Sequence, residues 1–277
     1  MRSFARTLTA AIVVALPLAA PFVSPGVASA GPAGHAAVDV LPGWRAADGR
    51  HLAGLRISLD EGWKTYWRAP GEAGIPPQFD WSGSENVGAV SVHWPVPEII
   101  TSNGVTTLGY AREVILPIEV TPADPAADIA VEAGLSFGIC EDVCMPLQTQ
   151  VSGVLPASVV AEDPRIVGAL AARPDTAAQA AVGAAACRVA PIADGMRVEL
   201  RLEMPPIGPD EYLVVEPQDP SVWVSQAIVR REGDILGAEA DFVPPDAKPF
   251  PLDPETLRIT VLSRGRGVDI QGCTDAR

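Results

Sequence analysis

Apolar and polar residues alternate along several stretches of this 277-residue chain, and the pattern limits the folds open to it. The clearest run spans residues 196–204, where apolar side chains alternate without a break with arginine and glutamate. Alternation with a period of two is typical of a β-strand that has one face in a core. Similar runs occupy residues 55–59, 90–94, 113–120, 128–140, 211–216, 222–231, 255–263 and 268–270. Because the 28 prolines supply rigid turns between such runs, we predict an all-β protein of many short strands.

Composition divides the chain into four segments. Residues 1–30 have the features of a signal peptide, with Arg2 and Arg6 before an apolar stretch and an alanine-rich cleavage site after it. Residues 31–156 and 188–277 carry the alternating runs, and residues 157–187 form an Ala-rich linker. The expected architecture is two β-sandwich domains joined by a short helical linker.

The linker contains signals for two helices. Asp163 and Pro164 have the types expected of an N-cap and a first helical residue, so residues 165–173 are predicted to be helical as far as Pro174. Residues 177–186, which are mostly alanine, are predicted to form a second helix.

The charge of the chain limits its partners. Its formal net charge is −14, whereas nucleic acids and anionic membranes attract basic surfaces, so neither is an expected partner. No apolar run after the signal peptide is suited to spanning a bilayer, and no stable membrane insertion is expected. We expect an exported protein.

Four cysteines are present, and in an oxidising compartment they are expected to form disulfides. Of the three possible pairings, proximity favours Cys140 with Cys144, which leaves Cys187 with Cys273. The second bond would close a long loop, worth about 4 kcal/mol by the chain-entropy account, and is predicted to be structural. The first would close too small a loop to stabilise much, so we interpret it as a redox-active dithiol.

The strand that leads to Cys140 gives a second reason for this interpretation. Phe137 and Ile139 share the apolar face of residues 128–140, so an unbroken alternation places Cys140 on the opposite face, away from the core. A bulge at Gly134 or Gly138 would reverse that phase. Bonding to Cys144 further requires residues 141–143 to turn the chain back on itself.

Three sequence blocks resemble the N-terminal periplasmic domain of the DsbD disulfide-reductase family, which includes the copper-sensitivity suppressor (ScsB) branch. They are Gly62-Trp-Lys-Thr-Tyr-Trp-Arg-Ala-Pro-Gly71, Leu108-Gly-Tyr-Ala-Arg-Glu-Val-Ile-Leu-Pro117 and Cys140-Glu-Asp-Val-Cys-Met-Pro146. They occur in the family's order, and the resemblance covers about residues 43–155. The close spacing of the two cysteines is similar to that of the copper-suppressor branch.

The resemblance implies an immunoglobulin-like sandwich in which Cys140 and Cys144 exchange with partner thiols, with Cys144 forming the mixed disulfides. It places the loop 97–109 as a cap over the disulfide, with Ile99 and Ile100 where the family has a phenylalanine. It also places Tyr66 and Tyr110 at aromatic positions near the site.

The resemblance further implies an electron relay of the protein-disulfide reductase type, associated with cytochrome c biogenesis or copper tolerance and needing no cofactor. Since the sequence ends without the family's membrane and thioredoxin-like domains, the expected donor is a separate membrane protein of DsbD or CcdA type. The expected acceptors are periplasmic thioredoxin-like proteins, and the second domain is expected to serve as a docking platform.

Two alternatives stay open at this point. Cys140, Cys144 and Met145, helped by His51 or His93, could bind Cu(I) in a copper-tolerance module, although no histidine has ligand spacing to the cysteines. The chain could instead be a non-catalytic binding protein whose two disulfides are both structural.

Overall fold

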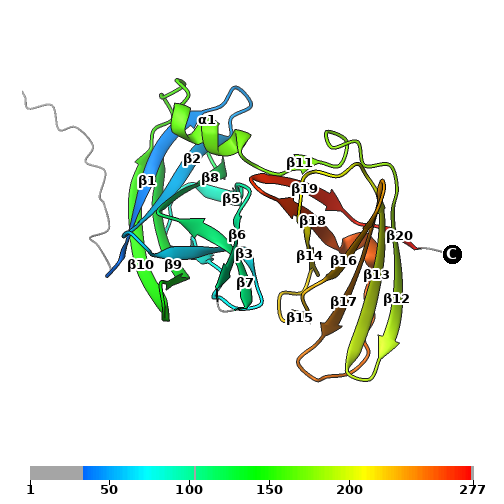
Figure 1. Cartoon of the computed structure of the whole chain (residues 1–277). Helices are drawn as coiled ribbons and strands as arrows, with labels where there is room; N and C mark the ends of the chain where they lie inside the picture. Colours follow the sequence, from blue (N-terminus) through cyan, green and yellow to red (C-terminus); the bar gives the residue numbers. More distant parts are fainter. Residues whose placement is uncertain (1–33, 103, 276–277) are drawn as a thin grey trace, which may run out of the picture.

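The computed structural model describes residues 34–102 and 104–275, and the predicted signal peptide lies outside them. Two β-sandwiches lie side by side, with one short helix over the end of the first (Figure 1). The expectation of an all-β chain built from two sandwiches is confirmed.

The first sandwich packs a four-stranded sheet against a six-stranded one. The four-stranded sheet has the order β1 (Ala36–Arg45), β2 (His51–Leu59), β8 (Glu113–Pro122) and β5 (Val87–Val92). The other has the order β10 (Cys144–Leu155), β9 (Ile129–Cys140), β3 (Lys64–Gly71), β7 (Val105–Ala111) and β6 (Glu98–Ser102), with β4 (Gln78–Asp80) paired to β9. Leu55 and Leu116 from the first sheet meet Trp67, Phe137 and Ile139 from the second in one buried core.

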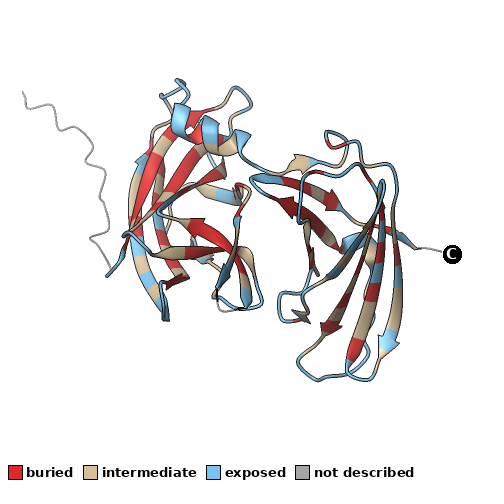
Figure 2. Ribbon diagram, viewed as in Figure 1, coloured by how far each residue is buried: buried red, intermediate tan, exposed pale blue. Residues whose placement is uncertain are grey.

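The second sandwich has the same design. One sheet has the order β11 (Asp175–Thr176), β19 (Arg266–Gln271), β18 (Arg258–Ser263) and β14 (Tyr212–Glu216). The other has the order β15 (Trp223–Val224), β17 (Ile235–Val243), β13 (Gly195–Glu203), β12 (Ala185–Ile192) and β20 (Thr274–Asp275), with β16 (Ile228–Glu232) also paired to β17. The alternation predicted over residues 196–204 is confirmed, because Val198, Leu200 and Leu202 of β13 are buried in this second core. Figure 2 shows buried residues recurring along the strands of both sandwiches.

The first predicted helix is confirmed as α1 (Pro164–Ala171). The Asp163 side chain caps it by accepting a hydrogen bond of 2.9 Å from the backbone N–H of Arg165. Its buried residue, Ile166, packs with Leu41 and Trp44 of β1, and so fixes the helix on the first sandwich.

The second predicted helix, over residues 177–186, is wrong. A single turn follows β11, the Gly183 N–H donates to the Glu203 carbonyl at 2.7 Å, and from Ala185 the chain runs as β12. Alanine favours helix only weakly, and a ten-residue helix is marginal in water, so pairing with β13 decides the conformation. A part of the predicted linker therefore belongs to the sheets of the second sandwich.

The strand predictions need correction in several places. β1 was not predicted, because its burial is nearly continuous and a bulge between Leu41 and Trp44 interrupts it. The single strand predicted over residues 222–231 is divided into β15 and β16. Proline cannot donate to a strand ladder, so Pro117 favours an edge or a bulge for the strand predicted over residues 113–120, but β8 lies between β2 and β5. The Pro117 carbonyl accepts a hydrogen bond from the N–H of His93, which follows the last residue of β5. Pro117 is tolerated because the N–H that it lacks would face the same side, where the ladder with β5 ends.

The two sandwiches are in direct contact. Leu262 of β18 is fully buried in the core cluster of the first sandwich, and Tyr212 and Val214 of β14 pack against the same cluster. The chain after α1 is held to the first sandwich, where the Val96 N–H donates to the Ala172 carbonyl at 2.8 Å.

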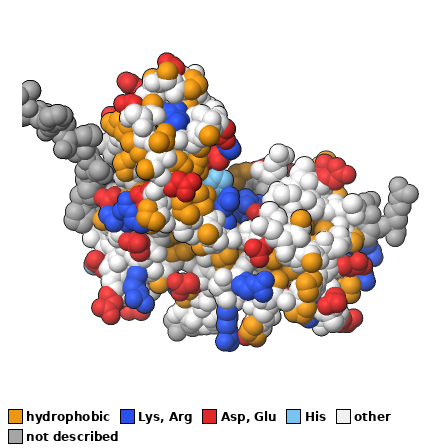
Figure 3. All heavy atoms as spheres, turned by 90° about the horizontal axis from the view of Figure 1, so that it is seen from above, with side chains coloured by type: hydrophobic (Ala, Val, Ile, Leu, Met, Phe, Trp, Pro, Cys, Tyr) orange, Lys and Arg blue, Asp and Glu red, His pale blue; other side chains and the backbone are white. Residues whose placement is uncertain are grey.

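The described part of the chain contains no helix long and apolar enough to cross a membrane. On the face seen in Figure 3, acidic and basic side chains are interspersed, without one large basic area.

Candidate redox-active disulfide

The β9–β10 hairpin brings Cys140 and Cys144 together. The two strands pair in continuous register from Ile129 with Leu155 to Cys140 with Cys144, so residues 141–143 make the turn that the disulfide requires. The Cα atoms lie 4.1 Å apart and the sulfurs are bonded, in the pairing favoured by proximity. There is no bulge at Gly134 or Gly138, because the register is unbroken.

The two cysteines differ in exposure. Phe137 and Ile139 point into the core, and the uninterrupted strand puts Cys140 on the other face of β9, as the alternation predicts. This face is covered, however, and Cys140 is only 5% exposed, whereas Cys144 is exposed. An attacking thiolate can therefore approach Cys144 more readily than Cys140.

Tyr66 of β3 covers the disulfide and contacts one of its sulfurs. Its Oη lies 2.9 Å from Sγ of Cys144, and its side chain is almost fully buried. Burial raises the pKa of Tyr66, so at neutral pH the phenol keeps its proton. Because a disulfide sulfur has no hydrogen to give, the Tyr66 hydroxyl is the donor in this contact.

Two glycines fit closely around the Tyr66 ring. A Cβ on Gly138 would lie 2.9 Å from the ring, and one on Gly74 would lie 2.6 Å from it. Gly74 also has a φ of 141°, which side-chain-bearing residues rarely adopt. The loop that contains Gly74 is held to β9 by a 3.1 Å hydrogen bond from the Gly138 N–H to the Ile75 carbonyl. The ring therefore lies between β9 and this loop, with its hydroxyl directed at Cys144.

The other residues implied by the resemblance are not brought to the disulfide. Ile99 and Ile100 lie on β6, which β7 and β3 separate from β9, so three strand spacings of about 4.8 Å intervene. Ile99 packs on the core, and Ile100 lines a cavity of about 690 Å³ together with Trp63. In place of the loop 97–109, Tyr66 contacts the disulfide at Sγ of Cys144, and the loop after β3 packs against the Tyr66 ring.

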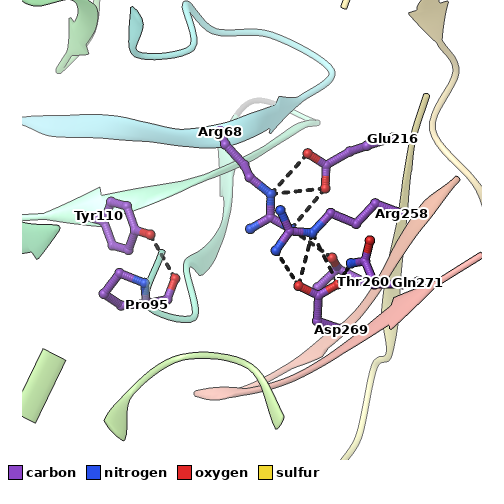
Figure 4. A network of polar contacts seen from close by, with 8 residues as sticks. All are labelled: Arg68, Pro95, Tyr110, Glu216, Arg258, Thr260, Asp269 and Gln271. Carbon is purple, nitrogen blue, oxygen red and sulfur yellow. Dashed lines mark hydrogen bonds and ion pairs between the residues drawn. The ribbon is translucent and has the colours of Figure 1, made fainter. Parts of the chain in front are cut away.

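Tyr110 also lies apart from the disulfide, on the core side of β7. Its hydroxyl donates to the Pro95 carbonyl at 2.8 Å, in a buried position (Figure 4). Desolvation strongly raises the pKa of Tyr110, so this phenol is neutral. Sequence reasoning missed the roles of Gly74 and Gly138, although Gly138 stands two residues before Cys140 and hence on the same face of the strand.

Cys187 and Cys273 form the second disulfide, with Cα atoms 5.6 Å apart and a sequence separation of 86. Their exposures are 1% and 4%, and both lie in the core of the second sandwich. Neither sulfur is as open to a partner as that of Cys144.

The histidines considered for copper binding belong to the other sheet or its flanks. His51 begins β2, is fully buried, and its Nε2 lies 2.6 Å from the Pro42 carbonyl, while His93 follows β5 and lies 3.7 Å from Glu119. Within residues 34–102 and 104–275, no group of three or more His, Cys, Asp or Glu side chains is placed to hold a metal ion.

Comparisons with known proteins agree with the resemblance seen in the sequence. Residues 37–156 match the family described as "Thiol:disulfide interchange protein DsbD, N-terminal". The fold is similar to the crystal structure of the N-terminal periplasmic domain of ScsB from Proteus mirabilis, with a TM-score of 0.69 and 23% identity over 91% of this chain and 100% of that one. A comparison with curated proteins gave no match. Residues 37–156 of this chain thus match the DsbD N-terminal family model, as the three sequence blocks indicated, and the whole chain has a fold similar to that of the ScsB structure.

Proposed function

We propose that this protein relays reducing equivalents through the Cys140–Cys144 pair, between a membrane electron donor and oxidised periplasmic proteins. The observation that carries the proposal is the unequal exposure of the two cysteines, since Cys144 is exposed and Cys140 is buried. The family match supports the chemistry, because its description names thiol:disulfide interchange.

Reduction of the protein begins at Cys144. A donor thiolate attacks its Sγ, a mixed disulfide forms, and the Cys140–Cys144 bond breaks with its electron pair leaving on Cys140. The donor's second thiol then attacks the donor sulfur of the mixed disulfide. This releases Cys144 as a thiolate and leaves the donor oxidised.

Transfer to an acceptor reverses these roles. The Cys144 thiolate attacks the acceptor disulfide, and Cys140 then attacks Cys144 to reform the internal bond. The acceptor leaves with two electrons as a dithiol. Cys140 is thus the resolving thiol in this direction. Its burial is compatible with this role, because a resolving thiol attacks only the neighbouring sulfur of Cys144 and not a partner protein.

The proposed donor is a separate membrane protein of DsbD or CcdA type, and the proposed acceptors are periplasmic thioredoxin-like proteins. The periplasm is the proposed compartment, in keeping with the ScsB structure, which is described as a periplasmic domain. Cys187–Cys273 is proposed to be a structural bond.

A redox titration of the purified protein, with alkylation and peptide mapping of all four cysteines, tests the proposal. We expect Cys140–Cys144 to open as a pair at roughly −120 to −270 mV, while Cys187–Cys273 stays closed at all potentials above about −300 mV. Equal resistance of both bonds would refute the relay and leave a structural sandwich.

Single-cysteine variants test the assignment of Cys144. Cys140→Ser leaves the exposed thiol, and its partner is a thioredoxin-like protein whose resolving cysteine is replaced and whose remaining cysteine is first converted to a mixed disulfide with thionitrobenzoate. The Cys144 thiolate is expected to attack the partner sulfur, release thionitrobenzoate and leave a trapped mixed disulfide between the two proteins. Cys144→Ser leaves the covered thiol and is expected to trap at least about tenfold less. The reverse order of trapping would assign the attacked sulfur to Cys140.

A further inference from the structure

Strand β3 connects the disulfide to the second sandwich. Tyr66 and Arg68 flank Trp67, whose side chain points into the core of the first sandwich. Tyr66 meets the sulfur of Cys144, and Arg68 reaches Glu216 at the end of β14. One short stretch of chain therefore contacts both the disulfide and the neighbouring sandwich.

Arg68 is bound to the second sandwich by a fork of hydrogen bonds (Figure 4). Its Nε lies 3.0 and 3.2 Å from the two carboxylate oxygens of Glu216, and its Nη2 lies 3.0 Å from one of them. The Nη2 group also donates to Oγ1 of Thr260 on β18 at 3.0 Å. The Arg68 and Glu216 side chains are 10% and 22% exposed, so water screens this ion pair much less than one at the surface.

The guanidinium of Arg68 is also fixed from the side of the first sandwich. It lies 3.8 Å from the centre of the Trp67 ring, in a cation–π contact. Its angular freedom is thus small, and a displacement of Glu216 would be transmitted to β3.

The loop around Tyr66 lies close to the second sandwich as well. Gly71, which ends β3, has a φ of 85°, and a Cβ placed on it would lie 3.6 Å from the Tyr212 hydroxyl. Three residues later, Gly74 lies against the Tyr66 ring. The second sandwich therefore lies next to the chain that leads from Tyr66 to Gly74, and both line one pocket.

We propose that the second sandwich fixes the position of Tyr66 over the disulfide, with Arg68 as the positioning residue that transmits its hold. This proposal rests on the proposed function, since it concerns the reactivity of the same disulfide. It also gives the second sandwich a role without chemistry of its own: the alignment of a hydroxyl group in the first.

The alignment matters most after reduction. Once the Cys140–Cys144 bond is broken, the Tyr66 hydroxyl can donate to the Cys144 thiolate, and a hydrogen bond to the charged form lowers the pKa of that thiol. Stabilising the thiolate stabilises the reduced protein. A loss of alignment therefore makes the protein harder to reduce and its reduced Cys144 less acidic.

A double-mutant cycle between Glu216→Ala and Tyr66→Phe tests the proposal in the full-length mature protein. The two readouts are the equilibrium constant of the Cys140–Cys144 disulfide with glutathione and the pH profile of Cys144 alkylation in the reduced protein. Tyr66→Phe is expected to shift the equilibrium about tenfold toward the disulfide, as for the loss of a hydrogen bond to a charged group. Glu216→Ala is expected to shift it at least about threefold in the same direction, and to have almost no effect when Tyr66 is already Phe.

Two further variants separate this coupling from a general loss of stability. Glu216→Gln keeps an acceptor for Arg68 and is expected to restore part of the effect. Asp241→Ala removes a carboxylate that is forked to Arg197 wholly within the second sandwich, and is expected to leave both readouts unchanged.

The outcomes distinguish this proposal from the proposed function. If the wild-type disulfide equilibrates with glutathione but Glu216→Ala leaves both readouts unchanged, the relay stands and the coupling is refuted. Equal effects of Glu216→Ala with Tyr or Phe at position 66 refute it too. If the wild-type disulfide does not equilibrate at all, both proposals fail.

Discussion

The Tyr66 hydroxyl contacts Sγ of Cys144, at 2.9 Å, and it does so from a buried position that keeps the phenol protonated. The contact is made with the sulfur of Cys144, the exposed cysteine of the pair. The chemistry of the pair is therefore expected to depend on one hydrogen atom of the Tyr66 side chain.

Replacing Tyr66 by Phe is expected to slow the alkylation of reduced Cys144 by iodoacetamide at pH 7. Without the donor, the pKa of the Cys144 thiol rises and the thiolate fraction falls by about tenfold. Alkylation stopped at timed intervals over a pH series, followed by peptide mass mapping, measures the alkylation rate of Cys144 and the pKa of its thiol. Tyr110→Phe is the matched control: it removes a buried hydroxyl that donates to the Pro95 carbonyl, on the core side of the sheet, and is expected to leave the pH profile unchanged. An unchanged profile in Tyr66→Phe would show that the hydroxyl has no part in the chemistry.

Gly138→Ala is expected to displace Tyr66, because the added methyl group would lie 2.9 Å from both the ring and the Ile75 side chain. Overpacking of this kind costs about 1–3 kcal/mol in the free energy of unfolding, measurable by urea denaturation. Gly134→Ala on the same strand is the control, since its methyl group would come no closer than 3.4 Å to the Gln150 side chain. Equal effects of the two substitutions would contradict a specific fit around Tyr66.

Removal of the second disulfide by Cys187→Ala and Cys273→Ala is expected to lower the free energy of unfolding by about 4 kcal/mol, because the bond closes a long loop. Urea denaturation measures the loss, and the glutathione equilibrium of Cys140–Cys144 is expected to change little so long as the second sandwich stays folded. A variant as stable as the wild type would argue against a structural role for this bond.

The stability of the first sandwich is expected to fall below about pH 6.5. Burial is the main cause that lowers the pKa of His51, whose Nε2–H donates to the Pro42 carbonyl while its buried Nδ1 has no hydrogen-bond partner in the structure. The unfolded chain takes up a proton near pH 6.5 before the folded chain does, so stability is full above that pH and is lost as the pH decreases toward the folded value.

The loss from one such histidine is at most about 1.4 kcal/mol per pH unit. His93, whose pKa is lowered first by burial and then by Arg173, adds a contribution of the same sign. Urea denaturation at pH 7.5 and 5.5 measures the slope, and His51→Gln is expected to show a smaller difference between the two pH values. An equal difference in the variant would assign the pH dependence to other groups.

Local patterns in the sequence were sufficient for much of the fold and part of the site. Strand β13 follows from the alternation of its own side chains, and α1 follows from Asp163 and Pro164. Cys140 directly follows Ile139, which faces the core, so it lies on the opposite face of the strand. Each depends on residues only a few positions apart, which is the range over which strand and helix periodicities act.

Contacts between distant segments decided the rest. Residues 177–186 became a turn and a strand because β13 offered backbone partners, which outweigh the helix preference of alanine. Cys140 is covered although it faces away from the core, because Tyr66 and the loop after β3 pack onto that face. The sequence does not distinguish Tyr66 from Tyr110, because each lies in an aromatic block of the same resemblance. The pairing of β3 with β7 and β9 places Tyr66 at the disulfide and Tyr110 in the core. The sequence by itself therefore determined α1, strands such as β13 and the cysteine pair, because these depend on neighbouring residues. The remaining strands, the contact of Tyr66 with the disulfide and the link to Glu216 arose from packing between residues far apart along the chain.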